Sequence, residues 1–294
     1  EVALKQAQFR NLLSHHGGVD PALVRDPVPS PVPLGYRNKI SLHAAPGETG
    51  ALLGYIGEDN RTVVDVPACP LAVAPLNERL AQLRADAAFM KKLEDCRSVI
   101  LRWTKKDGVI HFFGKDKANK PWLTESTPFG SLQVPRSSFF QVHHAVADSL
   151  LKHVNALLKA SEARSVVDAY GGVGVFARAA ARAGIPEIVW IDSDEGAIQA
   201  AKQNARDLEL RGVSFEAAPA AKGLRKALRR LAPDSVVVVV DPPRTGLDTA
   251  VVGLIHEATP RRIVYVSCAA DTMVRDLKLL KPGGYRIVES QLFD

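Results

Sequence analysis

The chain has 294 residues, 46% hydrophobic and 24% charged, and its formal net charge is +6. This composition is that of an ordinary globular protein, and the length predicts one large or two medium domains, of which we expect two. No apolar stretch reaches the roughly 18 residues needed to span a bilayer, so we expect no membrane partner. The positive charge favours an anionic partner such as nucleic acid, although this signal is weak by itself.

The first 13 residues, EVALKQAQFRNLL, space their apolar side chains as an amphipathic helix does, and they lack the apolar core of a secretion signal. Because the sequence does not begin with Met, we expect it to start inside a longer protein. Cys69, Cys96 and Cys268 are far apart and odd in number, which argues against a disulfide framework. We therefore expect a cytoplasmic location.

Alternating prolines at 27, 29, 31 and 33 predict an extended connector after this helix. A helix is expected from about Val73 to Met90, and short strands surround it. We expect these residues to form a small α+β domain of mostly antiparallel strands, spanning residues 1–130 together with the first helix. The predicted strands are 39–45, 51–57, 62–66, 98–104 and 109–114.

From Ser149 onward, helical segments alternate with nearly continuous apolar strands. This alternation is typical of an α/β fold in which helices cover both faces of a parallel sheet. We assign residues 131–294 to this domain. The predicted strands are 165–170, 187–192, 213–218, 235–241, 262–268 and 285–290.

Several of these strands end in acidic residues. Asp168 precedes a turn with glycines at 171, 172 and 174, which would let a ligand approach the backbone at the carboxyl edge of the sheet. Asp192, at the end of the next strand, could accept both hydroxyls of a ribose. A solvated acid is the alternative for Asp192, and the glycine turn fits a dinucleotide site equally well.

The segment VVVVVDPPRTGLD at 236–248 carries Asp241 directly after a buried strand. Pro242 and Pro243 fix a rigid extended exit without backbone donors, which a dinucleotide fold does not require. A helix or turn cap is the alternative role for Asp241. At the end of a later strand, Cys268 could by itself be core filling, a metal ligand or a nucleophile.

The first half of the chain contains cationic and aromatic residues close together in the sequence. In RNA-binding proteins, such cations bind phosphates and such aromatic rings stack on unpaired bases. A solvated basic face is the alternative. Histidines 15, 16, 143 and 144 lack ligand spacing to any acid or thiol, so we predict no zinc site. The mixed set is Tyr36, Arg37, Lys39, Arg102, Trp103, Lys105 and Lys106.

Six segments, in this order, resemble the RNA uracil-5-methyltransferases, which use S-adenosylmethionine to methylate C5 of a uridine. They are YRNKISLHA (36–44), CPLAVAPLN (69–77), SFFQV (138–142), DAYGGVGVF (168–176), DPPRTGLD (241–248) and SCAADTMVRDL (267–277). The resemblance covers most of the chain and implies a Rossmann-like class I methyltransferase sheet beside the smaller domain.

The resemblance implies that Gln141, Tyr170, Asp192 and Asp241 bind S-adenosylmethionine and that Cys268 is the nucleophile. Uracil C5 is too weak a nucleophile to attack a methyl sulfonium directly, so a thiolate first adds to C6 and makes C5 electron-rich. A position between a strand end and a helix would expose Cys268, and the helix dipole would favour its thiolate.

The chain departs from the family pattern at Ala269 and Ala270, where relatives usually have Asn-Pro or Asp-Pro, and at Val173 and Val175 in the glycine turn. Neither change removes a proposed catalytic group. The family's general base is a Glu that we expect beyond Asp294, so the base is not named.

Many relatives hold a 4Fe-4S cluster through four cysteines, the last in a context that resembles Cys69-Pro70. The other three would precede Glu1, so Cys69 is either an iron-sulfur ligand or a plain buried thiol. Cys96 has no counterpart in the family and is expected to be structural.

The expected partner is RNA, and ribosomal RNA is slightly favoured over transfer RNA because the cluster-bearing branch mostly acts on it. We expect a monomer. Two alternatives stay open: an RNA cytosine-5-methyltransferase, although no cysteine lies near Asp241, and a non-catalytic RNA-binding relative.

Overall fold

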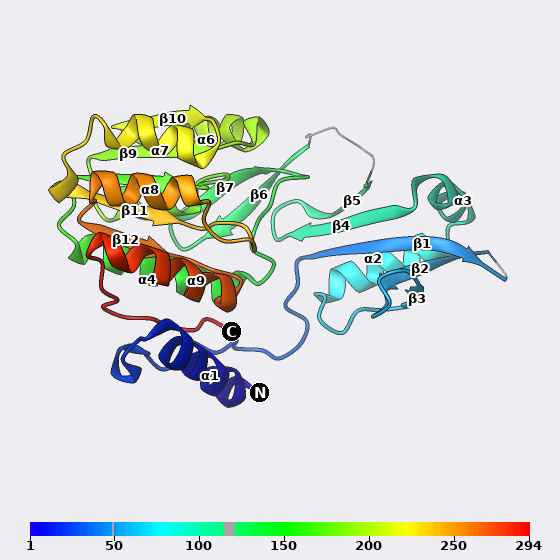
Figure 1. The fold of residues 1–294 in the computed structure, drawn as a ribbon. Helices are drawn as coiled ribbons and strands as arrows, with labels where there is room; N and C mark the ends of the chain where they lie inside the picture. Colours follow the sequence, from blue (N-terminus) through cyan, green and yellow to red (C-terminus); the bar gives the residue numbers. More distant parts are fainter. Residues whose placement is uncertain (49, 115–120) are drawn as a thin grey trace. The chain divides into compact units, whose positions relative to one another are not determined.

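The computed structural model describes residues 1–48, 50–114 and 121–294. The chain divides into a unit of Pro31–Ala145 and a unit made of Glu1–Ser30 with Val146–Asp294 (Figure 1). In the described residues, no helix is long and apolar enough to cross a membrane.

The unit of residues 31–145 is built on an antiparallel sheet in the order β3-β2-β1-β4-β5. Leu42, Leu53, Val99 and Leu101 on its strands are fully buried, which makes one face of the sheet the core. Two helices cover that face, and a separate hairpin, β6-β7, follows. The elements are β1 (Lys39–Gly47), β2 (Gly50–Ile56), β3 (Val63–Asp65), α2 (Ala74–Ala85), α3 (Ala87–Cys96), β4 (Ser98–Thr104), β5 (Gly108–Phe113), β6 (Trp122–Thr127) and β7 (Gly130–Pro135).

Two features of this unit differ from the prediction. The single helix expected near 73–90 is two helices, because Asp86 takes an extended conformation that ends α2, and its carboxylate then caps α3 by accepting from the backbone N–H groups of Ala88 and Phe89. The hairpin β6-β7 was not predicted, since the polar residues of WLTEST and GSLQVP hide its alternation.

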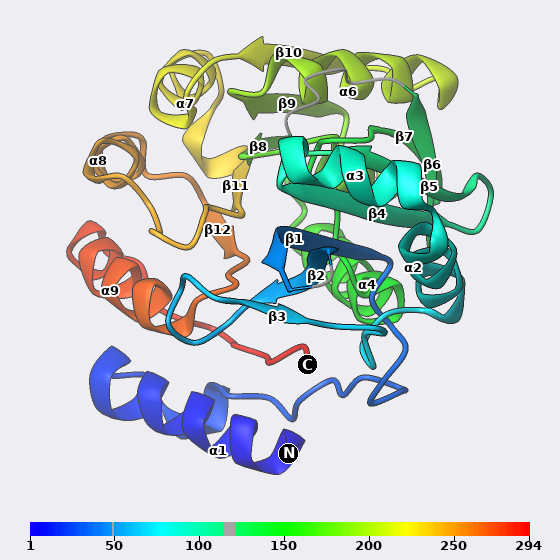
Figure 2. The same cartoon turned by 90° about the vertical axis from the view of Figure 1, so that its right-hand side faces the viewer.

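The other unit contains the predicted parallel sheet, in the order β10-β9-β8-β11-β12. The valines of β11 are all fully buried, as expected for a central strand covered on both faces. Helices α7, α8 and α9 lie in one layer on one face, and α4 lies on the other (Figure 2). The elements are α1 (Val2–Asn11), α4 (His144–Ala160), β8 (Ser165–Ala169), α5 (Val175–Arg182), β9 (Glu187–Asp192), α6 (Glu195–Asp207), β10 (Val213–Ala217), α7 (Ala220–Leu228), β11 (Val236–Val240), α8 (Thr249–Ala258), β12 (Arg262–Tyr265) and α9 (Ala270–Leu280), with short helical turns at Leu12–His16, Pro21–Leu23, Pro233–Ser235 and Lys281–Gly283.

The strand predicted at 285–290 does not form. Residues near the end of the chain run instead beside the segment after α1, with parallel bridges between Val24 and Ser290 and between Val28 and Phe293. The backbone N–H of Arg25 donates to the carbonyl of Ser290 at 2.8 Å, so the hydrogen bonds that a sixth sheet strand would need are made elsewhere.

The division into units also differs from the predicted boundary between residues 130 and 131. Residues 1–30 group with the parallel sheet because Leu13, Val19 and Val24 share an apolar cluster with Val274 of α9. Residues 131–145 group with the antiparallel unit, where β7 pairs with β6.

Candidate active site at the carboxyl edge of the parallel sheet

The register of the parallel strands brings three of the predicted site residues to one level. Ala169 of β8 pairs with Ile191 of β9 on one side and with Val240 of β11 on the other. The next residue of each strand segment is therefore Tyr170, Asp192 or Asp241, all at the carboxyl edge, where open α/β sheets bind their ligands.

The glycine turn after β8 folds over the indole of Trp190, which is fully buried in β9. Gly174 has φ +95°, and a Cβ built there would lie 1.4 Å from the indole ring. The indole Nε1 donates to the carbonyl of Gly172 at 3.2 Å. Gly172 itself has φ +53° and open space where a Cβ would be, so the turn leaves its backbone accessible to a ligand.

The Asp192 carboxylate is oriented by two backbone groups. Its Oδ2 accepts from the N–H of Gly172 at 2.7 Å, and its Oδ1 accepts from the N–H of Asp194 at 2.8 Å. The side chain stays partly exposed, and each oxygen has a second lone pair. A pair of ribose hydroxyls would fit this arrangement.

Two further acids lie at the same edge. Asp168 is fully buried, and burial raises its pKa to about 8, with smaller contributions from the charges of Asp241 and Asp192 and an opposing one from the Ala177 N–H bond. Burial raises the pKa of Asp241 to about 6. The site therefore holds carboxyl groups of clearly different acidity.

Two buried polar atoms at this edge have no hydrogen-bond partner among the described residues: Oδ1 of Asp168 and the hydroxyl of Tyr170. Tyr170 has φ +68°, and burial, followed by the charges of Asp248 and Asp276, raises its pKa to about 12. Orphaned polar atoms beside acids and an open glycine turn fit a ligand that carries hydroxyls and positive charge, as S-adenosylmethionine does.

Cys268 is exposed at the same edge. Strand β12 ends at Tyr265, and α9 begins at Ala270, so the thiol stands in the short turn between them. The Ser267 hydroxyl accepts from the N–H of Ala269 at 3.0 Å and donates to its carbonyl at 2.9 Å, which fixes this turn. Cys268 is thus exposed in the turn between a strand and a helix, as predicted.

Gln141 belongs to the unit of residues 31–145, unlike the other four predicted catalytic and cofactor residues. It lies between β7 and α4, and its backbone carbonyl accepts from Nδ2 of Asn38 at 3.3 Å. The structure therefore brings together Tyr170, Asp192, Asp241 and Cys268, and Gln141 is described only within its own unit.

Cys69 is a buried free cysteine. The side chain is buried in the apolar core with Leu76 and Leu80, and the backbone of Cys69 is tied to the Asn77 amide by two hydrogen bonds. Among residues 1–48, 50–114 and 121–294, no group of three or more His, Cys, Asp or Glu side chains could hold a metal ion.

Arg102 is not the phosphate contact that the basic and aromatic pattern suggested. It is fully buried, and its Nη2 lies 2.9 Å from Oε1 of the equally buried Glu125 on β6. Its Nη1 donates to the carbonyls of Pro135, Arg136 and Ser138. The guanidinium thus supports the hairpin and the segment after it, because a buried charge requires partners on all sides.

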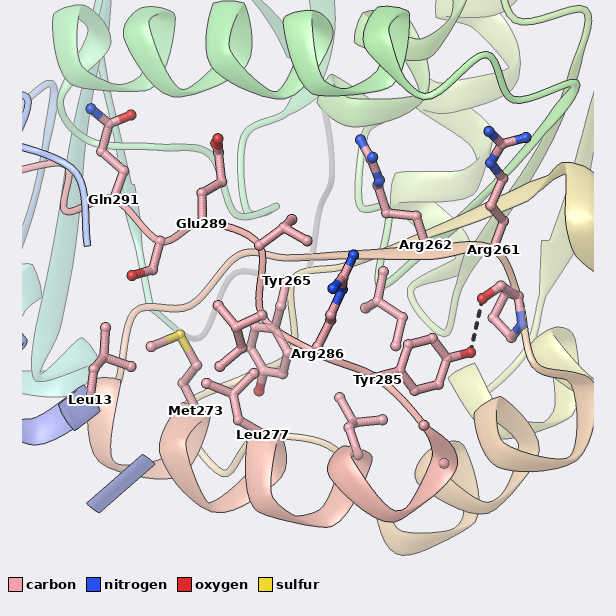
Figure 3. A pocket seen from close by; sticks show the side chains of 18 of the residues that line it. Leu13, Arg261, Arg262, Tyr265, Met273, Leu277, Tyr285, Arg286, Glu289 and Gln291 are labelled. Atoms are coloured by element: carbon pink, nitrogen blue, oxygen red, sulfur yellow. Dashed lines mark hydrogen bonds between the residues drawn. The ribbon is translucent and has the colours of Figure 1, made fainter. Parts of the chain in front are cut away.

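A cavity of about 620 Å³ lies between β12, α9 and residues 283–291. Figure 3 shows its mixed lining of arginines, tyrosines and apolar side chains, with the Tyr285 hydroxyl donating to the carbonyl of Pro260 at 2.9 Å. None of the five predicted catalytic or cofactor residues lines it. The candidate active site is therefore the strand-end cluster and not this cavity.

The comparison with protein families gives one match over more than half of the chain. The family model for tRNA (uracil-5-)-methyltransferase matches residues 130–294, a range that includes Gln141 and all four strand-end residues.

Two similar proteins with curated names match the whole length of this chain. An uncharacterized RNA methyltransferase of Gloeobacter violaceus is 28% identical over 100% of this chain and 74% of its own length. The tRNA (uracil(54)-C(5))-methyltransferase of Schizosaccharomyces pombe is 25% identical over 100% of this chain, which spans 58% of that relative.

Among solved structures, the tRNA (uracil-54, C5)-methyltransferase of Pyrococcus abyssi in complex with S-adenosyl-L-homocysteine superposes with a TM-score of 0.73 at 26% identity. The match covers 98% of this chain and 79% of that one.

Proposed function

The chain belongs to the tRNA (uracil-5-)-methyltransferase family, and from this premise we propose that it methylates C5 of a uridine in structured RNA through a covalent adduct of Cys268. The observation that carries the proposal is the single sheet edge that holds Tyr170, Asp192 and Asp241 beside the exposed thiol. The proposed reaction needs residues that bind the methyl donor close to a thiol that can attack the base, and this sheet edge provides both.

Three of the four predicted cofactor residues lie at the sheet edge and would hold the cofactor there, and Gln141 remains a proposed fourth contact. Asp192 would accept the two ribose hydroxyls, and Asp241, when ionised, would attract the positive charge, while Tyr170 would offer its unpaired hydroxyl. When bound, S-adenosylmethionine supplies an electrophilic methyl group. The complex of the Pyrococcus abyssi relative with S-adenosyl-L-homocysteine supports this choice of cofactor.

Cys268 would carry the covalent step. Its thiolate adds to C6 of the uracil, and the electron pair of the C5–C6 double bond moves onto C5 and the O4 carbonyl. C5 would then form a bond to the methyl group while the bond between that methyl and the cofactor sulfur breaks, and S-adenosyl-L-homocysteine would leave. Loss of the C5 proton to a base and expulsion of the thiolate restore the double bond and release the cysteine unchanged.

We propose a transfer RNA as the substrate. The two relatives named for uridine 54 both act on tRNA, and this outweighs the slight preference for ribosomal RNA, which rested only on the resemblance of Cys69-Pro70 to a cluster ligand. On the RNA-binding surface, Lys105 and Lys106 are exposed and remain candidates for phosphate contacts, whereas Arg102 does not.

The test is methyl transfer from labelled S-adenosylmethionine to transfer RNA and to ribosomal RNA, each with uridine or cytidine at the candidate site. We expect label in uridine-containing transfer RNA from the wild-type chain and none from Cys268→Ser. Label in cytidine would favour the cytosine-5 alternative. Tight RNA binding without any transfer would favour a non-catalytic relative.

A further inference from the structure

Asp276 is a fully buried carboxylate on α9 whose charge contributes to the raised pKa of Tyr170 but which has no cofactor or substrate contact assigned above. Its Oδ2 accepts from the backbone N–H of Leu247 and from the hydroxyl of Tyr265, each at 2.6 Å. Its Oδ1 accepts from Nε of Arg275 at 2.9 Å and from Nη2 at 2.7 Å. Four donors from three segments thus meet on one side chain.

These donors come from the segments that flank the candidate site. Leu247 lies in the loop 241–248, which begins with Asp241, and Tyr265 is the last residue of β12, three positions before Cys268. Asp276 itself lies on the helix that begins two residues after Cys268. The carboxylate therefore joins the strand end that carries the acid to the strand end that carries the thiol.

The loop lies directly on this carboxylate. Gly246 has φ +77°, and a Cβ built there would come within 2.5 Å of Oδ2 of Asp276 and 2.4 Å of Nη2 of Arg275. The same Nη2 donates to the carbonyl of Thr245 at 2.8 Å. Only glycine fits at 246, so the close approach of loop and helix is built into the sequence.

The loop is stiff enough to transmit this attachment to Asp241. Pro242 and Pro243 have fixed φ angles, and the N–H of Gly246 donates to the carbonyl of Pro243 at 2.8 Å, which closes a turn. A displacement at Leu247 therefore moves the short segment that starts at Asp241, because few of its torsions are free to absorb the change.

Stability alone is a poor explanation for this network. An apolar side chain of similar volume often replaces a buried charge without loss of stability, whereas a buried charge with directed hydrogen bonds fixes one arrangement of the groups around it. Arg275, its cationic partner, keeps half of its side chain exposed, so its attraction to Asp276 is partly screened by solvent.

We propose that Asp276 is a positioning residue that holds the loop 241–248 against α9, so that Asp241 and Cys268 face the same ligand. The proposal rests on the proposed function, because it assigns Asp276 to the alignment of that reaction's two components. Asp276 acts through Leu247, Tyr265 and Arg275, and it does not touch the substrate or the cofactor.

The test compares Asp276→Asn with Leu224→Ala in the full chain. Asn has nearly the same shape as Asp, but its NH2 group replaces one of the two oxygens that accept hydrogen bonds. This NH2 group must therefore face donors with which it cannot form hydrogen bonds. Leu224 is fully buried on α7 in the same apolar core and belongs to no part of the network, so Leu224→Ala controls for lost stability. Both variants are assayed at a temperature at which thermal unfolding shows them to be folded.

We expect kcat to fall about tenfold or more in Asp276→Asn with the KM for RNA unchanged, since small misplacements of reacting groups have effects of this size. Leu224→Ala should keep kcat within about twofold. Hydrogen exchange should show faster exchange of the Leu247 amide in Asp276→Asn only. If Asp276→Asn does not fold, Tyr265→Phe replaces it, because this change removes one hydrogen bond to Asp276 and keeps the ring. We then expect a smaller fall in kcat and a smaller increase in the exchange rate of the Leu247 amide.

Two results would overturn the proposal: an unchanged exchange rate at Leu247, or a loss of kcat no larger than that of the control. A wild-type chain that transfers no methyl group would instead refute the proposed function. In that case the affinity for S-adenosylmethionine, which depends on Asp241 but not on RNA, takes the place of kcat. If the affinity for S-adenosylmethionine then falls in Asp276→Asn but not in Leu224→Ala, the positioning role is supported. If the two variants have the same affinity, the positioning role is refuted.

Discussion

Three acidic residues at the sheet edge, Asp168, Asp192 and Asp241, have different surroundings, and the roles proposed for Asp192 and Asp241 follow from them. Asp192 is partly exposed and held by two N–H groups, whereas burial raises the pKa of Asp241 to about 6 and that of Asp168 to about 8. Near neutral pH, Asp241 is therefore mostly ionised and Asp168 mostly protonated. These differences lead to three predictions for single residues.

Asp192→Ala should weaken S-adenosylmethionine binding at least about tenfold, because charge-assisted hydrogen bonds to the ribose are lost, each worth about 1.5–3 kcal/mol. Calorimetry measures the affinity. Asp194→Ala is the matched control: Asp194 caps α6 by accepting from the N–H of Gly196 at 2.8 Å, so its loss should lower stability without changing affinity. Equal affinity in wild type and Asp192→Ala would contradict the ribose role.

Affinity for S-adenosylmethionine should fall as the pH drops from 7 to 5. Burial raises the folded-state pKa of Asp241 to about 6, so the carboxylate that we propose attracts the cationic cofactor becomes protonated within this range. Asp168 changes its charge near pH 8, so between pH 7 and 5 it stays mostly protonated and the change in charge comes from Asp241. Calorimetry at several pH values should give a flat profile for Asp241→Asn, and a wild-type profile that is equally flat would argue against the assignment.

The same shift sets the sign of a stability change in the cofactor-free chain. Because the folded-state pKa of Asp241 lies above its ordinary value of 3.8, the folded state binds the proton more tightly than the unfolded state does. The stability that this gives is present below about pH 4 and is lost as the pH rises through about 6. Asp241→Asn should remove this part of the pH dependence in urea unfolding.

RNA with 5-fluorouridine at the target should trap a covalent complex that survives a denaturing gel, since fluorine cannot leave C5 as a proton does. Cys268→Ser should abolish the complex, because a serine hydroxyl stays protonated at neutral pH. Cys96→Ser and Cys69→Ser should still form it if they fold. Peptide mapping of the crosslink to another residue would show that Cys268 is not the nucleophile.

At the scale of elements, the glycine turn and β9 depend on each other. Gly174 can lie over Trp190 only because it lacks a Cβ and takes φ +95°. The turn supplies the Gly172 N–H that orients Asp192, so the packing beneath the turn and the proposed ligand site above it depend on the same backbone segment.

Gly174→Ala should lower the free energy of unfolding by about 2–4 kcal/mol, because a methyl group meets the indole and the positive φ is strained. Gly253→Ala, in α8, should raise it by about 0.5–1 kcal/mol, because that position is open and alanine favours a helix. Urea denaturation of both variants tests the contrast. Similar effects would mean that the turn moves away from Trp190 at little cost.

The parallel strands and their end residues were predictable because each is a local pattern. A run of valines followed by Asp-Pro-Pro identifies both β11 and its exit, and the positions of Tyr170, Asp192 and Cys268 follow from neighbouring strand ends. Arg102 was misassigned because its burial depends on Glu125, 23 residues away on a strand with no clear alternation. One local sign did mark Asp276: an acid between the apolar residues Met273, Leu277 and Leu280 of α9.

At the scale of the whole molecule, the predicted functions divide between the two units. The unit of residues 31–145 carries Gln141 and the exposed Lys105 and Lys106, and the other unit carries the strand-end cluster. Residues 1–30 group with the parallel sheet, and the pairing of Val24 and Val28 with residues near 290 joins segments at opposite ends of the sequence, which no local pattern reveals.

RNA affinity of the full chain should fall steeply with salt, and changing Lys105 and Lys106 together to Ala should reduce the slope of log affinity against log salt by about 1–2, since each phosphate contact contributes about 0.7–0.9. Changing the exposed Lys91 and Lys92 of α3 to Ala alters the net charge equally and should reduce the slope less. Equal slopes for both double variants would mean that Lys105 and Lys106 form only a solvated face.

The indole beneath the glycine turn also makes the site optically visible. Trp190 is buried, and its Nε1 is bonded to the Gly172 carbonyl of the turn that would contact the cofactor, while Trp103 and Trp122 belong to the other unit. Replacing those two with Phe would leave Trp190 as the single tryptophan, and its fluorescence, excited selectively over tyrosine, should respond to movement of the turn. Stopped-flow emission from that chain would then time the arrival of cofactor at the sheet edge without any label.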